Sequence, residues 1–97
     1  MNYAYLLLCA DGSLYAGWTN DLQRRLHAHN EGTGAKYTRA RRPVRLVYAE
    51  AFDTKEEAQK RECQIKKLRH NQRLSLVTAG RENPEMSTLV HDINAAE

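Results

Sequence analysis

Features that would mark a membrane protein or an exported protein are missing from this sequence of 97 residues. No apolar run is long enough to cross a bilayer, and residues 1–5 lack the basic segment and cleavage site of a signal peptide. The only cysteines, Cys9 and Cys63, have no CxxC spacing, so we expect reduced, packed thiols rather than a disulfide. With no internal repeat either, the sequence predicts one small cytoplasmic protein.

Acidic residues are missing from one stretch near the middle of the chain. Residues 32–49 contain one Lys and four Arg and neither Asp nor Glu. Residues 1–79 hold 14 Lys and Arg against 8 Asp and Glu, whereas residues 80–97 hold one Arg against four acids. A basic field attracts polyanions because neutralised phosphates release counterions. A solvated face that only keeps the protein soluble would have a similar composition, but the concentrated run favours nucleic acid.

The hydrophobic pattern predicts an α+β domain with a small three-stranded sheet flanked by helices. Residues 3–9 and 13–18 form a hairpin, and residues 45–52 form a third strand with Leu46 and Tyr48 on one face and Val47 and Ala49 on the other. Residues 35–43 form a basic loop. Four helices are expected: one ending near Asn30, one from Thr54 to about His70, a short one capped by Asn71, and one starting at Asn83. We assign residues 1–80 to the domain and residues 81–97 to a tail with a short amphipathic helix.

Charged and polar side chains interrupt the apolar faces of two predicted helices. Arg25 and His29 share a face with the leucines of the first helix, and Glu62 lies on the apolar stripe of the second. A buried Arg25–Glu62 ion pair is the simplest explanation for two such charges. The addition of a histidine and nearby tyrosines favours a polar site set in an apolar wall.

The register of the hairpin decides whether its tyrosines join this site. A two-residue turn would place Tyr5 and Tyr15 on opposite faces of the sheet. A three-residue loop with Gly12 in the left-handed region would pair Tyr5 with Gly17 and bring both tyrosines to one face. We predict the bulged form, in which Gly17 leaves room for a backbone or a phosphate to approach.

The motifs together resemble those of the GIY-YIG nuclease superfamily over residues 3–78. Tyr3-Ala4-Tyr5 and Tyr15-Ala16-Gly17 stand where the family has its two triplets, followed by Arg25, His29 and Arg61-Glu62 at the family's spacing. The stretches 11–17 and 34–38 resemble the small stand-alone bacterial UPF0213 (YhbQ-like) group. The first triplet departs from the family pattern because position 3 is Tyr rather than Gly.

The resemblance implies a Mg²⁺- or Mn²⁺-dependent endonuclease that hydrolyses phosphodiester bonds in DNA. Its implied catalytic residues are Tyr5, Tyr15, Arg25, His29 and Glu62. Tyr15 would act as general base or orient water, assisted by Tyr5, while Arg25 would bind the scissile phosphate. Glu62 would hold one weakly bound ion. Because an ordinary tyrosine has a pKa near ~10, Arg25, His29 or the metal must favour the phenolate or take up its proton.

Basic and aromatic residues outside the implied site are candidates for binding nucleic acid. They are Lys36, Tyr37, Arg39, Arg41, Arg42 and Lys66. Phosphate contacts position a strand without reading its sequence, and Tyr37 either stacks on a base or packs on its own loop. No predicted helix has the residues of a groove reader. We therefore expect structure-specific action on branched, flapped or single-stranded DNA, in repair or recombination, with RNA as another possible substrate.

Two other functions are compatible with the sequence. The same fold could bind nucleic acid without cleaving it, or cleave only with a protein partner. Alternatively, the helix that carries Met86 and Ile93 could dock on another protein, although such a helix more often covers its own core. Asn71 is a further candidate for the site, because several nucleases use an asparagine beyond the glutamate.

Overall fold

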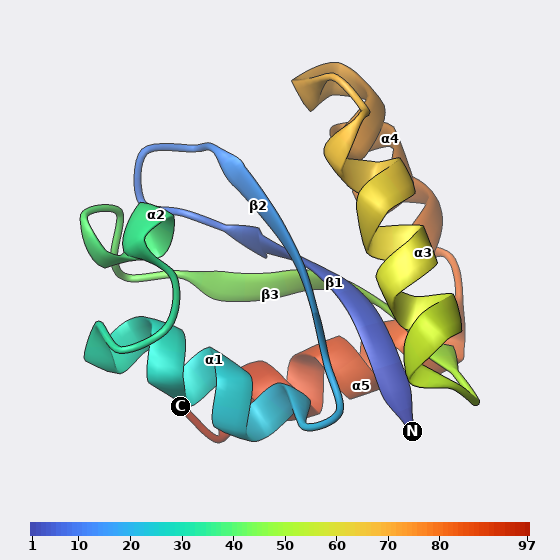
Figure 1. The fold of residues 1–97 in the computed structure, drawn as a ribbon, viewed down its shortest axis with the longest axis horizontal. Coiled ribbons are helices and arrows are strands. Elements are labelled where there is room, and N and C mark those ends of the chain that lie inside the picture. Colours follow the sequence, from blue (N-terminus) through green and yellow to red (C-terminus); the bar gives the residue numbers. More distant parts are fainter.

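A computed structural model describes residues 1–97 and has a three-stranded antiparallel sheet at its centre. The strands are β1 (Asn2–Leu8), β2 (Leu14–Thr19) and β3 (Arg45–Phe52). Their order in the sheet is β2-β1-β3, with β1 in the middle (Figure 1). The predicted α+β class, with a hairpin and a later third strand, is confirmed.

The hairpin adopts the bulged register. Tyr5 pairs with Gly17 and Leu7 pairs with Tyr15, while Gly12 has a φ of 84°, in the left-handed region that favours glycine. Because residues two apart share a face of a strand, Tyr5 and Tyr15 lie on the same side of the sheet, as predicted.

The expected alternation along β3 is wrong at its centre. Leu6 pairs with Tyr48 but Leu7 pairs with Leu46, so Val47 is an extra residue opposite the junction. One extra residue in a strand reverses the alternation of the side chains that follow it. Leu46 therefore packs in the core cluster of Tyr5, whereas Tyr48 packs in the cluster on the other face.

Five helices surround the sheet. They are α1 (Leu22–Glu31), α2 (Lys36–Arg39), α3 (Lys55–Lys66), α4 (His70–Arg81) and α5 (Pro84–Ala95). The Asp21, Thr54 and Asn83 side chains cap α1, α3 and α5. None of these helices is both long and apolar enough to cross a membrane.

Two helix boundaries differ from the predictions, and α2 lies in a segment expected to be loop. The chain turns after Lys66 rather than at His70, and α4 begins behind Arg69 rather than Asn71. The reason is local, because the Arg69 N–H donates to the Gln72 side chain at 2.8 Å. This bond satisfies one of the free donors at the helix start.

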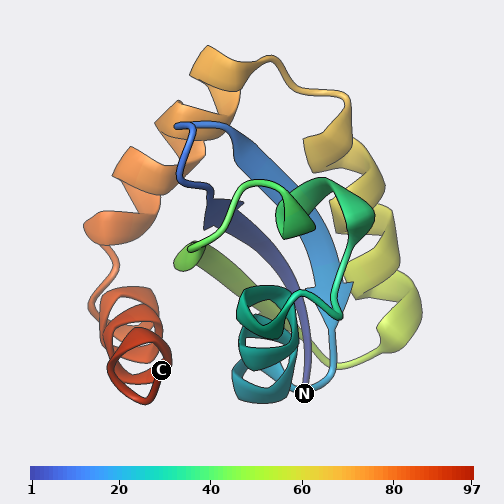
Figure 2. The same cartoon turned by 90° about the vertical axis from the view of Figure 1, so that its left-hand side faces the viewer.

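The helices cover the sheet from two sides (Figure 2). Leu22 and Leu26 of α1 pack on the face that carries Tyr5 and Leu7. Ile65 of α3 and Val77 of α4 pack on the opposite face. The two faces of the sheet therefore have separate clusters of buried side chains.

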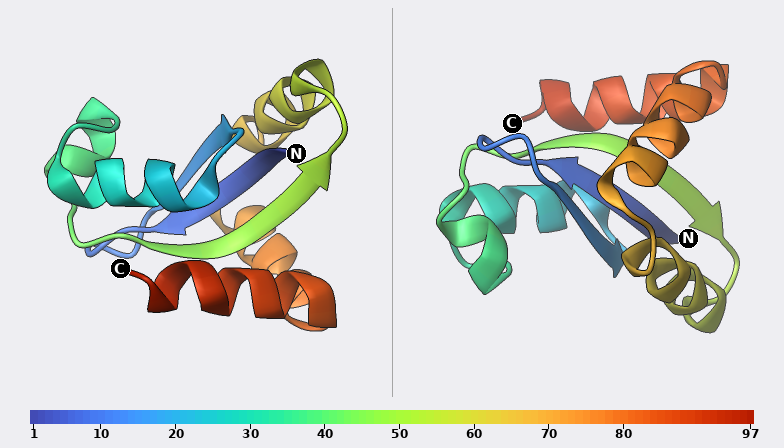
Figure 3. Two further views of the ribbon diagram at one scale, coloured as in Figure 1. Left: turned by 90° about the horizontal axis from the view of Figure 1, so that it is seen from below. Right: turned by 90° about the horizontal axis from the view of Figure 1, so that it is seen from above.

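Two asparagines cover the outer edge of β3, along which α5 runs (Figure 3). Asn94 of α5 accepts from the Leu46 N–H at 2.9 Å and donates to the Leu46 carbonyl at 2.8 Å. Asn30 of α1 makes the same pair of bonds with Val44, at 2.8 and 3.0 Å. These amides occupy backbone groups that an additional strand would otherwise use.

Candidate active site

Tyr5 and His29 form the buried centre of the candidate site. The Tyr5 side chain is 2% exposed and the His29 side chain is fully buried. The Tyr5 hydroxyl lies 3.1 Å from Nε2 of His29, and Nε of Arg25 lies 3.5 Å from the same hydroxyl. Three residues that the sequence selected from β1 and α1 are therefore brought together by the packing of α1 on the sheet.

Gly17 has a different role from the one that the sequence suggested. A Cβ atom at position 17 would lie 2.5 Å from the Tyr5 hydroxyl oxygen, far inside van der Waals contact. The space beside Gly17 is filled by the Tyr5 phenol, so no backbone or phosphate approaches there. The glycine of the second triplet thus permits the tyrosine of the first triplet to lie across β2.

Thr38 is a buried member of the site that sequence reasoning missed. Its side chain is fully buried, its Oγ1 lies 2.8 Å from Nδ1 of His29, and it donates to the Ala35 carbonyl at 3.0 Å. The single turn of α2 is too short to show an apolar period, and a threonine in a basic loop is ordinarily exposed. Thr38 belongs to the stretch 34–38 that resembles the UPF0213 group, but no local pattern predicts that its side chain is buried.

Burial shifts the pKa values of Tyr5 and His29 in opposite directions. Burial raises the pKa of Tyr5 to about 12, an effect that the hydrogen bond from Arg25 opposes. Burial, with the Arg25 charge as a smaller cause, lowers the pKa of His29 to about 4. Both side chains are therefore neutral at pH 7, and neither is suited to take a proton from water.

Tyr15 lies between the buried centre and the surface. Its ring meets that of His29 edge-on, with centroids 5.4 Å apart, and stacks on that of Tyr37 with centroids 5.8 Å apart. The Arg41 guanidinium lies 3.8 Å from the Tyr37 centroid and is paired with Asp11 at 2.9 Å. Tyr37 therefore packs on its own loop here, and a base that stacked on it would compete with these contacts.

Glu62 approaches the site from α3. Its side chain is 16% exposed and its nearest cation is Lys66, with Nζ 3.4 Å from Oε2. The expected alternative, an Arg25–Glu62 ion pair, is not formed. The charges of Tyr15 and Glu62 nevertheless add to the raised pKa of Tyr5, whereas the Arg25 charge lowers that pKa, so all three groups act electrostatically on one phenol.

The donor atoms near Glu62 suit a hard divalent cation that keeps most of its own water. No group of three His, Cys, Asp or Glu side chains is positioned to hold a metal ion. Mg²⁺ is commonly bound by one or two carboxylates together with waters and substrate phosphates. A single half-buried carboxylate fits that pattern, with the substrate supplying the remaining oxygen ligands.

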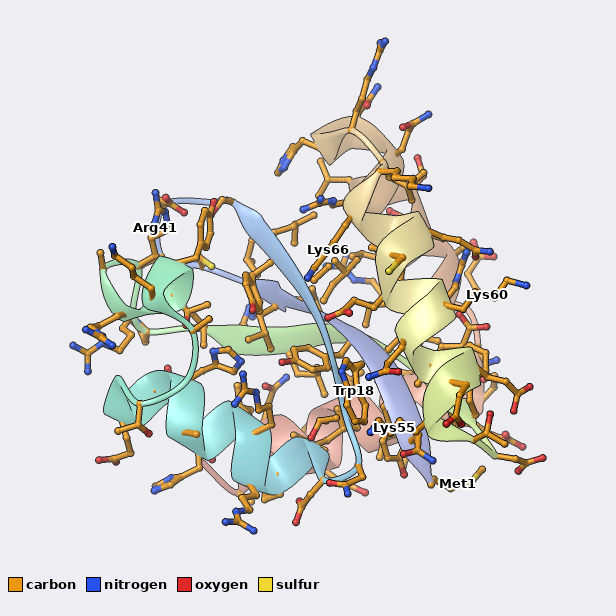
Figure 4. All side chains as sticks on the ribbon, in the orientation of Figure 1. Met1, Trp18, Arg41, Lys55, Lys60 and Lys66 are labelled. Atoms are coloured by element: carbon orange, nitrogen blue, oxygen red, sulfur yellow. The ribbon has the colours of Figure 1, made fainter.

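Five of the six candidate nucleic-acid contacts lie in two places. Tyr37 and Lys66 line one shallow pocket with Tyr15, and Arg41 lies beside it at the hairpin turn (Figure 4). Arg39 and Arg42 instead donate to carbonyls at the end of α1, those of Gly32 at 3.2 Å and Asn30 at 3.4 Å. Cations at a helix C-terminus are stabilising, so these two arginines support α1. Lys36 and Asn71 are exposed.

Arg73 of α4 also lines the Tyr15 pocket, and sequence reasoning did not select it. Its guanidinium donates to the Leu14 carbonyl at 2.7 Å and to the Lys66 carbonyl at 3.1 Å, while its Nε is buried without a partner. One side chain thereby ties α4 to β2 and to the end of α3. Only the three-dimensional arrangement distinguishes it from the other arginines.

The sequence is similar to proteins of one family. The family model described as the GIY-YIG catalytic domain matches residues 1–75, a range that contains all five catalytic candidates. The UPF0213 protein of Clostridium perfringens is 61% identical, over 81% of this chain and 85% of that protein. The UPF0213 protein of Bacillus velezensis is 54% identical, over 87% of this chain and 85% of that protein.

A solved structure is similar as well. The solution NMR structure of a UPF0213 protein from Bacillus halodurans has a TM-score of 0.55 and 46% identity, and covers 91% of this chain and 94% of that chain. The similarity therefore extends over the sheet and the surrounding helices. The name UPF0213 carries no activity, so the chemistry must be argued from the site.

Proposed function

The chain belongs to the GIY-YIG family, whose catalytic domain is a nuclease-like fold that acts on DNA, and from this membership we propose that it is a metal-dependent endonuclease. The observation that carries the proposal is that Arg25 contacts the Tyr5 hydroxyl while Tyr15 meets the ring of the His29 bound to that hydroxyl. Glu62, from a third element, lies close enough for its charge to act on Tyr5. Phosphodiester hydrolysis needs a fixed cation, a group that orients water and a ligand for a metal. These three side chains supply them.

Arg25 would bind the scissile phosphate. Its Nε hydrogen bond to Tyr5 holds the guanidinium at one corner and leaves the terminal amino groups for phosphate oxygens. A charge fixed in this way stabilises the developing negative charge without reorganising during the reaction.

Tyr15 would orient or deprotonate the attacking water. It is the tyrosine of the pair that is half-exposed, whereas Tyr5 is buried and has a pKa of about 12. We assign Tyr5 and His29 to positioning, because both are neutral and fully engaged with protein groups. Glu62 would hold Mg²⁺ or Mn²⁺, and the bound ion would polarise a phosphate oxygen and favour ionisation of water.

The surface around Tyr15 favours recognition of strand shape rather than of sequence. Tyr37 and Lys66 offer an aromatic ring and a cation beside Tyr15, a combination that suits a displaced or single strand. We propose branched, flapped or single-stranded DNA as substrate, in repair or recombination, and therefore the cytoplasm as the place of action. RNA of the same flapped form is the alternative substrate, and its cleavage in place of DNA would identify it as the substrate.

Cleavage of supercoiled plasmid and of flapped DNA with Mg²⁺ or Mn²⁺ tests the proposal. We expect Glu62→Gln and Tyr15→Phe to slow cleavage by roughly 100-fold or more. Glu56→Gln, an exposed change on the same helix, and Tyr3→Phe, a change on the neighbouring strand, should cleave like the unmodified protein. Cleavage that survives both site substitutions would contradict the assignment.

A second candidate is a binding module that is catalytically silent or depends on a partner. The observation that favours it is the scarcity of metal ligands, because no three carboxylate, histidine or cysteine groups converge. Salt-sensitive binding of flapped DNA without cleavage, under every metal condition, would support this candidate over the nuclease.

A further inference from the structure

We propose that Thr38 is a positioning residue that sets the tautomer of His29 and, through His29 and Tyr5, holds Arg25 in place. The proposal deepens the proposed function and rests on it only for the effect on cleavage. The tautomer itself is a property of the protein without substrate. Neither composition nor the motifs of the sequence assign any role to Thr38.

Five groups form a continuous hydrogen-bond network across β1, α1 and α2. Arg25 Nε lies 3.5 Å from the Tyr5 hydroxyl, which lies 3.1 Å from His29 Nε2. On the other side of the ring, His29 Nδ1 lies 2.8 Å from Thr38 Oγ1, and that hydroxyl reaches the Ala35 carbonyl at 3.0 Å. Each of the three central groups touches one partner on either side.

The two ends of the network impose its direction. Arg25 can only donate, because a guanidinium has no acceptor, and the Ala35 carbonyl can only accept. The Tyr5 oxygen therefore accepts from Arg25 and its own proton points to His29 Nε2. A neutral imidazole whose Nε2 accepts carries its proton on Nδ1. This proton is donated to Thr38, whose hydroxyl proton goes to Ala35.

The opposite direction leaves a buried donor without an acceptor. If Nε2 carried the proton, both His29 Nε2 and Arg25 Nε would donate to the Tyr5 oxygen. The Tyr5 O–H would then have no acceptor. Tyr5 is 2% exposed, and His29 and Thr38 are fully buried, so bulk water does not replace the missing partner. An unsatisfied buried polar group is unfavourable, and this cost selects one tautomer.

Thr38 therefore acts on Arg25 through two intermediate side chains, His29 and Tyr5. Without its hydroxyl oxygen, the Nδ1 proton of His29 loses its acceptor. Each tautomer then leaves one buried donor unpaired, the His29 Nδ1–H or the Tyr5 O–H, so the Nε2 form becomes populated. The Nε2 proton then competes with Arg25 Nε for the Tyr5 oxygen. Gly34 packs against one side of the ring, since a Cβ at this position would lie 2.5 Å from Nδ1, and the ring cannot move in that direction.

Long-range ¹H–¹⁵N correlation spectra of the His29 ring at pH 7 test the proposal. In the unmodified protein we expect a protonated Nδ1 and an unprotonated Nε2. Thr38→Val, which keeps the shape and removes the hydroxyl, should give a detectable population protonated on Nε2, whereas Thr38→Ser should retain the proton on Nδ1. Thr19→Val is the matched control, because Thr19 is also buried but bonds to the backbone of Asp21.

Every outcome of these spectra either supports or overturns the role of Thr38. A protonated Nε2 in the unmodified protein would overturn the proposal even if Thr38→Val failed to fold, and so would an unchanged tautomer in Thr38→Val. For cleavage of flapped DNA, we expect at least a 10-fold loss in kcat for Thr38→Val and recovery in Thr38→Ser. If neither the unmodified protein nor any variant cleaves DNA, the nuclease proposal fails. The spectra still decide the role of Thr38 in that case.

Discussion

The Tyr5 hydroxyl and His29 Nε2 lie 3.1 Å apart in a part of the protein that water does not reach. This hydrogen bond joins the central strand to α1, the helix that carries Arg25. A side chain on β1 and one on α1 thereby determine where the guanidinium lies relative to Tyr15. The same bond also makes the stability of the fold sensitive to substitutions and to pH.

Replacement of Tyr5 by Phe should destabilise the protein. The ring would still fill its place beside Gly17, but His29 Nε2 would lose its hydrogen-bond donor. We expect the free energy of unfolding to fall by about 1–3 kcal/mol, the usual cost of an unsatisfied buried polar group, as measured by urea denaturation. Tyr3→Phe is the matched control on the same strand and should change it little. Equal midpoints for both variants would argue against the bond.

The free energy of unfolding should decrease as the pH is lowered from about 6.5 to about 4. The pKa of His29 is about 4 in the folded protein and 6.5 in an unperturbed chain, so in this range the unfolded state binds more protons. A shift of this size corresponds to about 3 kcal/mol. The contribution is complete above pH 6.5 and is lost as the folded pKa is reached.

The control for this pH dependence exploits two histidines on one helix. His29→Gln should abolish the decrease between pH 6.5 and 4, while His27→Gln, which changes an exposed residue, should retain it. Urea titrations at several pH values measure both slopes. A His29→Gln protein with the slope of the unmodified protein would assign the dependence to other groups.

Local chemistry accounts for what could be predicted from the sequence. The left-handed Gly12 and the alternation in β1 and β2 determine the hairpin register, and with it the shared face of Tyr5 and Tyr15. Capping by Asp21 and Thr54 likewise depends only on neighbours along the chain. These signals place all five catalytic candidates on the correct elements without reference to any tertiary contact.

The features that could not be predicted depend on contacts between distant segments. The extra residue Val47 in β3 is accommodated by packing on both faces of the sheet, not by a glycine or a proline. Thr38 is buried only because α2 docks on His29. Arg73 resembles any helical arginine until α4 brings it beside Leu14. The sequence pattern around Thr38 and Arg73 is that of exposed residues, and the pattern around Val47 is that of a regular strand.

Arg73→Lys should destabilise the protein although it keeps the charge. A lysine ammonium lacks the planar fork that reaches the Leu14 and Lys66 carbonyls together, so one of them would lose its donor. We expect a loss of about 1–3 kcal/mol in the free energy of unfolding. Arg69→Lys, at an exposed position just before the same helix, is the control and should leave the urea midpoint unchanged.

Arg25→Lys should separate catalysis from binding. The ammonium would keep the charge near the phosphate, so the dependence of DNA binding on salt concentration should change little. It would lose the planar guanidinium that bonds to Tyr5 through one nitrogen and can meet two phosphate oxygens through the others. We expect cleavage of flapped DNA to slow by roughly 100-fold to 1,000-fold, the usual effect of removing one fixed donor.

Arg24→Lys provides the comparison, because Arg24 is the neighbouring residue on α1 and is exposed. Both substitutions change the same chemical groups on the same helix, and only the half-buried Arg25 contacts Tyr5. A nuclease that depends on a fixed guanidinium should lose activity with Arg25→Lys and keep it with Arg24→Lys. Equal activities in the two variants would mean that the cation acts only through its charge, and the hydrogen bond from Arg25 to Tyr5 would then have no role in catalysis.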